Sequence, residues 1–200
     1  YGVGTMIQAA LDDGCRDIIL GLGGSCTNDC GAGMAAALGA VFCDSSGKSF
    51  VPTGDTLHEV ASMDVSLARK KFEGCKLRAM CDVTNPLFGS SGAAYTFAPQ
   101  KGADENMTKR LDQNLRHLSS IIEKCCGKDV SQEPGAGAAG GMGAAVVALL
   151  GGTLQSGIET VLDVTSFDEE LQGADLVITG EGKVDRQSLD GKVISGIAAH

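Results

Sequence analysis

Apolar residues recur at helical spacing in two parts of the chain. In residues 7–11 they stand at positions i, i+3 and i+4 ahead of Gly14, which predicts a helix that ends at a glycine. Between Asp104 and Lys124 they return every three or four positions, which predicts a long amphipathic helix with its apolar side on the core. Its apolar positions are Met107, Leu111, Leu115, Leu118 and Ile122.

Short apolar runs without helical spacing predict buried strands. They are DIILGL (residues 17–22), VFCD (41–44), KLRAMCD (76–82) and ADLVIT (174–179). The other segments predict a turn at DSSGK (44–48) and helices over residues 32–40, 63–73, 141–150, 157–163 and from Ser188 onward. Because strands alternate with helices, we expect an α/β fold, with a mixed, largely parallel sheet flanked by helices.

Three loops with polar residues follow three of the predicted strands. They cover residues 21–31, 82–102 and 180–185. The carboxyl ends of parallel strands meet at one edge of a sheet, where ligands bind in such folds. The second loop is long and has no predicted element, and loops of that kind in compact domains are usually functional. We therefore expect the three loops to form one site.

The composition excludes several classes of partner. The net charge of -9 argues against nucleic acid or anionic membranes as main partners, because long-range attraction to phosphate polymers needs a basic face. The uncharged stretch Pro134–Gly157 is too weakly apolar for a membrane span, and residues 1–4 show no signal peptide. Eight cysteines without regular spacing indicate reduced thiols. We therefore expect a cytoplasmic protein with a small-molecule partner and no nucleic-acid or membrane partner; homo-oligomerisation stays open.

The glycine-rich stretch GLGGSCTNDCGAGM (residues 21–34) lies between a predicted strand and a predicted helix. Cys26 replaces the third glycine of a dinucleotide fingerprint, and no Walker loop is present. The stretch fits an anion cradle, in which backbone and side-chain donors stand ahead of a helix N-terminus. The cradle residues are Gly23, Gly24, Ser25, Thr27 and Asn28. Asp29 then suits a magnesium ion or a substrate hydroxyl.

Two other interpretations of this stretch stay open. Thr27, Asn28 or Asp29 can simply cap the next helix, as these residue types often do. Cys26 and Cys30 can form a thiol redox pair. Redox motifs usually have two residues between their cysteines, however, and here there are three.

The second loop carries an acid, an amide and a lysine. Asp82 stands at a strand end, and Asn85 precedes Pro86, where an Asx turn is the structural alternative. Lys101 can meet phosphate as a point charge, although a solvated lysine at a helix start is commoner.

The third loop carries two acids beside glycines. Glu181 and Asp185 stand four residues apart, next to Gly180 and Gly182. Two nearby carboxylates can hold magnesium or take a hydroxyl proton. The structural alternative makes Asp185 a cap and leaves Glu181 in solvent. Taken together, the three loops hold the glycines, donors, acids and cation that phosphoryl transfer needs.

Four longer motifs closely resemble, in the same order, those of the bacterial type I glycerate kinase family. They are GLGGSCTNDCGAGMAAALGA, CDVTNPLFGSSGAAYTFAPQKGA, PGAGAAGGMGAA and ADLVITGEGKVDRQSLDGK. The resemblance runs over essentially all 200 residues. It implies a cytoplasmic enzyme of two α/β domains with the site between them. It also implies ATP- and magnesium-dependent phosphorylation of D-glycerate at the 2-hydroxyl, which yields 2-phosphoglycerate.

On this resemblance, Asp82 and Asp185 are the acids nearest the chemistry, one orienting the hydroxyl and one near magnesium, in an order that stays open. Lys101 is expected on phosphate, and Asp29 and Glu181 are the expected magnesium ligands. The residues expected to bind substrate or phosphate are Gly23, Gly24, Ser25, Thr27, Asn28, Asn85, Gly180 and Gly182. The alternative from another class is a non-catalytic module that binds a small phosphorylated ligand.

The chain departs from the family pattern in two respects. The family usually has alanine and glycine at the positions of Cys26 and Cys30, which implies that these thiols are incidental. The family's opening segment, a PDSFK-like strand and loop plus an acidic DGGEG loop, is missing before Tyr1, and so is its C-terminal part. We therefore expect residues 1–200 to be an internal portion of a glycerate kinase, with no domain boundary assigned. Alone, this portion should be inactive.

Overall fold

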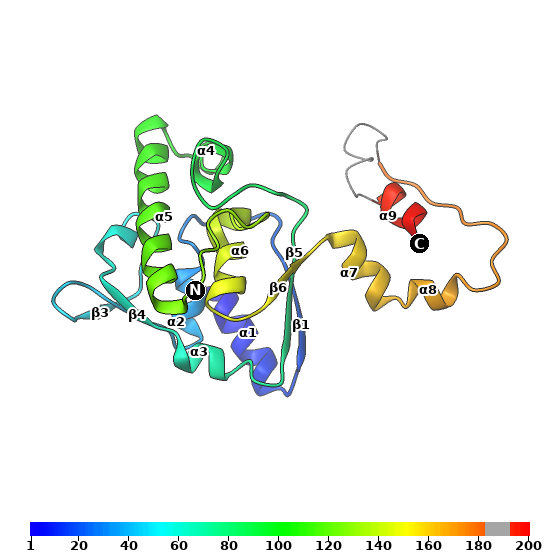
Figure 1. Ribbon diagram of the computed structural model, residues 1–200, viewed down its shortest axis with the longest axis horizontal. Helices are drawn as coiled ribbons and strands as arrows, with labels where there is room; N and C mark the ends of the chain where they lie inside the picture. The colour runs from blue at the N-terminus through cyan, green and yellow to red at the C-terminus, as the bar shows by residue number, and fades with distance from the viewer. Residues whose placement is uncertain (183–192) are drawn as a thin grey trace. The chain divides into compact units, whose positions relative to one another are not determined.

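The computed structural model describes residues 1–182 and 193–200, which form two compact units (Figure 1). The first unit is Tyr1–Leu154 and the second is Gln155–His200. Each unit is considered by itself below.

A parallel sheet organises the first unit. Strand β1 (Asp17–Gly21) pairs in parallel with β5 (Lys76–Met80), and β6 (Thr153–Gln155), at the end of the unit, lies on the other side of β5. Helix α1 (Gly2–Asp12) precedes β1. The expected α/β fold is confirmed, and so are the predicted strands over residues 17–22 and 76–82. Strand β6 is three residues long and was not predicted, because so short a segment shows no period.

Helices cover one face of this sheet (Figure 1). Helix α2 (Ala32–Ala37) packs on α1, and α6 (Ala138–Ala148) packs on β5, which turns its buried Leu77 and Ala79 toward the core. Short helices α4 (Ala93–Phe97) and η2 (Pro99–Lys101) stand in the segment predicted to be a structureless loop, so that prediction was wrong in part.

The long helix α5 (Glu105–Cys126) confirms the strongest periodic signal in the sequence. The Asp104 carboxylate accepts a hydrogen bond from the Met107 amide at 2.8 Å and caps the first turn. Gly127 ends the helix in the left-handed conformation, at φ 69°. The predicted stripe is buried from its middle to its end, at Leu115, Leu118 and Ile122.

A small antiparallel sheet lies beside these helices. Its strand order is β3 (Ser49–Phe50), β2 (Val41–Cys43) and β4 (Ser62–Asp64). The short helix η1 (Leu57–Glu59) lies in the connection between β3 and β4, and helix α3 (Ser66–Lys70) follows β4. The predicted helix over residues 63–73 is therefore too long. Its first residues pair with β2 as β4, and the Asp64 carboxylate accepts from the Ser66 amide at 2.8 Å where strand gives way to helix.

The second unit is helical in its described part. It contains α7 (Gly157–Val164), capped by Ser156, then α8 (Phe167–Glu170) and α9 (Val193–Ala199). The predicted strand over residues 174–179 is wrong: the segment has no strand pairing, and Leu176 and Ile178 are 77% and 88% exposed. A strand needs a neighbouring strand to satisfy its backbone, and an apolar pattern does not supply one. Ser188 lies outside the described residues.

The structure also bears on the membrane prediction. Among the helices that the structure describes, none has both the length and the apolar character that crossing a bilayer requires.

Candidate functional site at the carboxyl ends of β1 and β5

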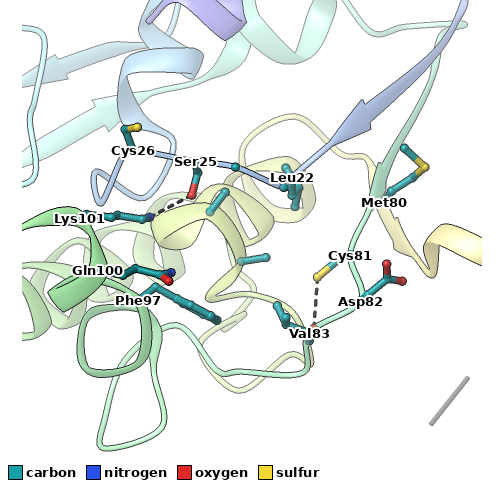
Figure 2. Close-up of a pocket in the computed structure, with 14 residues that line it drawn as sticks. Leu22, Ser25, Cys26, Met80, Cys81, Asp82, Val83, Phe97, Gln100 and Lys101 are labelled. Carbon is teal, nitrogen blue, oxygen red and sulfur yellow. Dashed lines mark hydrogen bonds between the residues drawn. The ribbon is translucent and has the colours of Figure 1, made fainter. Parts of the chain in front are cut away.

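A cavity of about 600 Å³ opens at the carboxyl ends of the two parallel strands (Figure 2). The loops after β1 and β5, the segment from α4 to η2, and the start of α6 supply its lining. The lining residues are Leu22, Gly23, Gly24, Ser25, Cys26, Met80, Cys81, Asp82, Val83, Phe97, Gln100, Lys101, Ala138 and Ala139. Five of the predicted site residues are thus brought together, namely Gly23, Gly24, Ser25, Asp82 and Lys101.

The loop after β1 presents an open backbone to the cavity. Gly24 adopts a left-handed conformation at φ 66°, and a Cβ atom at Gly23 or Gly24 would meet no neighbouring heavy atom within 4 Å. The backbone amides of residues 23–28 donate no hydrogen bond to any acceptor in the described part of the chain. These donors therefore remain available to water or to an anion, as the cradle prediction requires.

Lys101 reaches this loop from η2. Its Nζ atom donates to Ser25 Oγ at 2.9 Å and to the Thr27 carbonyl oxygen at 2.7 Å. Burial lowers the pKa of Lys101, while the nearby Cys26 and Asp29 oppose that effect. The lysine is thus a partly buried cation held against the cradle, and it is not the solvated helix-start residue of the structural alternative.

Asp82 contributes a carboxylate to the same cavity from the β5 side. Figure 2 shows Lys101 and Gln100 entering from one side and Asp82 beside Met80 on the other. The neighbouring Cys81 thiol donates to the Val83 carbonyl oxygen at 3.2 Å, and burial raises the pKa of Cys81. Lys101 is thus the one cation, and Asp82 the one carboxylate, among the described residues that line the cavity.

A glycine turn at the start of α6 supports the cradle from behind. Ala139, Gly140 and Gly141 all have left-handed backbones, at φ 51°, 68° and 94°. The Thr27 hydroxyl donates to the Ala139 carbonyl oxygen at 3.1 Å, and the Cys30 amide donates to the Gly140 carbonyl oxygen at 2.9 Å. The two glycine segments, about 110 residues apart in sequence, thus form one unit. Their contact fixes the shape of the cradle.

Several predicted residues have other roles in the structure. The Asp29 carboxylate accepts from the amides of Gly31 at 3.0 Å and Gly33 at 3.1 Å, so it caps α2, which is the structural alternative for this residue. It does not line the cavity. The Asn85 amide donates to the Ser91 carbonyl oxygen at 2.8 Å and braces the loop after β5.

Thr27 and Asn28 also lie behind the lining. Thr27 holds Lys101 and the α6 turn, as described above. Both polar atoms of the Asn28 side-chain amide are buried without a hydrogen-bond partner among the described residues. A buried amide without a partner is unusual, because it loses its bonds to water without replacement. The predicted contact of Asn28 with a ligand stays a prediction.

The third predicted loop belongs to the second unit. Gly180, Glu181 and Gly182 are described there, and Asp185 lies outside the described residues. In the described part of the chain, no group of three histidine, cysteine or acidic residues is arranged to hold a metal ion. The magnesium roles of Asp29 and Glu181 are therefore untested predictions.

The thiol redox interpretation finds no support. Cys26 is exposed on the cavity, whereas Cys30 is completely buried, and burial strongly raises the pKa of Cys30. Both thiols are free. A redox pair needs thiolates that a partner can reach, and Cys30 does not meet that requirement.

Sequence reasoning missed some of the lining. Gln100, Phe97, Ala138 and Ala139 were not predicted, and neither was the contribution of Cys26 to the cavity wall. The repeated glycines before α6 were the one available signal for this segment, because a chain needs them where backbones approach closely. Nothing in the sequence distinguishes Gln100 from other loop glutamines.

Comparisons with known proteins extend these observations. The sequence profile of the glycerate kinase family matches residues 1–200. A "Glycerate kinase" of Bacillus cereus is 53% identical over 98% of this chain, and a "Glycerate 2-kinase" of Escherichia coli is 49% identical over 98%. A crystal structure from Salmonella typhimurium LT2, of a protein provisionally named glycerate kinase 2, superposes with a TM-score of 0.91 over the whole chain at 47% identity.

These matches cover only part of each relative. The chain spans 52% of both curated relatives and 53% of the Salmonella chain, which is about half of their length.

Proposed function

The chain belongs to the glycerate kinase family, and from this premise we propose that the whole protein transfers a phosphoryl group from ATP to D-glycerate. The acceptor is the 2-hydroxyl, and the product is 2-phosphoglycerate. The observation that carries the proposal is the single cavity in which Lys101, the open cradle of residues 23–26 and Asp82 come together at the strand ends. The names of the relatives support the choice of substrate.

The described residues supply the parts that such a transfer needs. Transfer of a phosphoryl group depends mainly on positioning and on neutralising negative charge. Lys101 and the amides of residues 23–26 supply positive charge and hydrogen-bond donors on one side of the cavity. We propose that Asp82, from the β5 side, orients the acceptor hydroxyl and takes its proton. Asp185 is the second candidate for that role.

The residues present also fit a magnesium ion. Magnesium in kinase sites is usually bound by one or two carboxylates together with substrate phosphates. Asp82 is the one carboxylate among the described lining residues and would hold the ion, whereas the Asp29 carboxylate accepts from the amides of Gly31 and Gly33. The magnesium role of Glu181, in the second unit, stays a separate prediction. When bound, the ion would offset phosphate charge.

We further propose a cytoplasmic location, which the absence of a membrane-spanning helix in the described residues allows.

The test is turnover of the whole protein. ATP and D-glycerate should give ADP and phosphoglycerate, and phosphorus NMR of the product distinguishes the 2-phosphate from the 3-phosphate. Asp82→Asn should lower kcat by about a hundredfold or more, since a general base contributes on that order. Asp13→Asn, at an exposed carboxylate that follows α1, is the matched control. Binding of phosphorylated ligands without turnover by the wild type would favour the non-catalytic alternative.

A further inference from the structure

We infer that the cavity beside Lys101 is the site of the acid acceptor, and that Lys101 and Ser25 bind the acceptor's carboxylate and not the nucleotide phosphates. The inference rests on the proposed function and makes it more specific, because the cradle alone suits either a carboxylate or a phosphate.

The charges in the cavity favour a small monoanion. Among the described lining residues, Lys101 is the one cation and Asp82 the one anion. A triphosphate carries several negative charges, and proteins bind it with several cations or metal ions. One ammonium group matches one carboxylate. Asp82 can accept a hydrogen bond from a hydroxyl group of a hydroxy acid.

The donors are suitably paired for a carboxylate. Lys101 Nζ has three N–H groups, and two of them are used by Ser25 Oγ and the Thr27 carbonyl oxygen. The third remains for a ligand. Ser25 Oγ accepts from Lys101, so the hydroxyl proton of Ser25 is still available as a donor. Two adjacent donors, 2.9 Å apart, can each bind one oxygen of the same carboxylate.

Burial of the lysine agrees with this assignment. Partial burial makes the charged ammonium less favourable and lowers the pKa of Lys101. An arriving carboxylate would compensate that cost and raise the pKa again. The cavity, at about 600 Å³, is larger than a three-carbon acid and leaves space for the phosphoryl group that the acid receives. Apolar residues complete the wall, namely Leu22, Met80, Val83 and Phe97.

The experiment compares the two Michaelis constants of the whole enzyme. Lys101→Met should raise KM for D-glycerate about tenfold or more, because it removes a charged hydrogen bond, and should change KM for MgATP less than about twofold. Ser25→Ala should raise KM for D-glycerate about threefold, which corresponds to a neutral hydrogen bond. Lys70→Met, at an exposed lysine of α3, is the matched control and should change neither constant. Glycerol lacks the carboxylate, so its kcat/KM should be well below that of D-glycerate in the wild type. In Lys101→Met the two kcat/KM values should be similar.

Two outcomes would overturn the assignment. An increase in KM for MgATP that equals or exceeds the increase for D-glycerate would place phosphate on Lys101. Unchanged KM values in both Lys101→Met and Ser25→Ala, with circular dichroism spectra like the wild type, would remove both residues from binding.

Calorimetric titration separates this inference from the proposed function. D-glycerate and MgATP are titrated singly into the wild-type protein and into Lys101→Met, without turnover. If the wild type shows no kinase activity but binds D-glycerate, and Lys101→Met loses that binding while it keeps that of MgATP, the assignment holds and the proposed function fails. If the wild type turns over both substrates but Lys101→Met binds D-glycerate normally, the assignment fails and the function holds.

Discussion

Gly140 lies where the start of α6 contacts the glycine-rich loop after β1. Its φ is +68°, and a Cβ atom there would lie 2.1 Å from the Thr27 carbonyl oxygen and 2.5 Å from Asn28 Cα. Gly140→Ala should therefore lower the free energy of unfolding by about 2–4 kcal/mol, since strain and overlap combine. The measurement is urea denaturation of the whole protein, with the transition monitored by circular dichroism.

Gly151→Ala is the matched control for this prediction. Gly151 is also left-handed, at φ +72°, but a Cβ atom there would meet nothing within 4 Å. Gly151→Ala should therefore lower the free energy of unfolding only by the conformational strain, about 1 kcal/mol. Equal losses in the two variants would mean that the approach of Gly140 to Thr27 is not important for stability.

Cysteine reactivity gives a second residue-level prediction. Cys26 is exposed on the cavity, and Cys30 is buried with a raised pKa, so N-ethylmaleimide should modify Cys26 far faster than Cys30 in the native protein. D-glycerate should protect Cys26. Cys15, exposed before β1 and absent from the lining of the cavity, is the internal control and should react equally with and without D-glycerate. Mass spectrometry of peptides reads all three sites; rapid labelling of Cys30 would contradict its burial.

At the scale of residues, the sequence located the loops of the site better than the role of each side chain. Gly23, Gly24, Ser25 and Asp82 were predicted because their residue types stand next to strand ends. Lys101 was predicted because a lysine in the long loop after β5 can meet phosphate as a point charge. Asp29 was predicted to bind magnesium, and that role stays a prediction; in the structure its carboxylate accepts from the amides of Gly31 and Gly33 at the start of α2. A residue that can cap a helix and a residue that can bind a metal look the same in sequence, so only coordinates separate them.

Asp104 caps the N-terminus of helix α5. The Asp104 carboxylate accepts a hydrogen bond from the Met107 amide, and Asp104 stands three residues after Lys101. Asp104→Ala should destabilise the protein by about 1 kcal/mol, and Asp104→Ser should recover most of that loss, because serine also caps well. Urea midpoints of the three proteins are the measurement. A loss that is the same in both variants would show that the cap contributes little.

At this scale, periodic segments were predictable and short ones were not. Helix α5 has six turns of regular spacing, so its prediction was right to within about two residues at either end. Strands β3, β4 and β6 have two or three residues each, and no period can be detected in so few positions. Residues 174–179 have the composition of a strand but no paired neighbour, because pairing depends on distant chain segments that a local pattern does not contain.

The pH dependence of the second unit follows from His200. Its Nδ1 lies 2.6 Å from Asp168 Oδ1 and its Nε2 lies 3.5 Å from Glu159 Oε2, and the hydrogen bond with Asp168 is the main reason why the pKa of His200 is raised. The protonated ring stabilises the folded state fully below the unfolded pKa of about 6.5. That stabilisation is lost as the pH rises through the raised, folded-state pKa.

NMR titration of the His200 ring in the whole protein measures this shift, and hydrogen exchange in α7 and α9 should accelerate over the same pH range. Asp168→Asn should bring the pKa of His200 back toward its ordinary value, whereas Asp175→Asn, at an acid of the same unit, should not. An unshifted His200 in the wild type would remove the basis of the prediction.

Residues 1–200 alone should not catalyse the phosphoryl transfer. The described cavity contains one cation and one carboxylate, and reacting groups must be held within near-attack distance by groups that converge from all sides. The relatives are about twice as long as this chain, so half of their length has no counterpart in it. A misplacement of about 1 Å can cost roughly a hundredfold in rate. The isolated chain should therefore release no ADP above background.

The same chain should still bind D-glycerate weakly, because Lys101, Ser25 and the cradle all lie within its first unit. It should also self-associate, since Ile178 and Leu176 expose apolar surface that is normally covered in a folded protein. A coupled ADP-release assay, with the whole protein as control, and light scattering of the isolated chain test both statements. Turnover near the rate of the whole protein would show that these 200 residues contain a complete site.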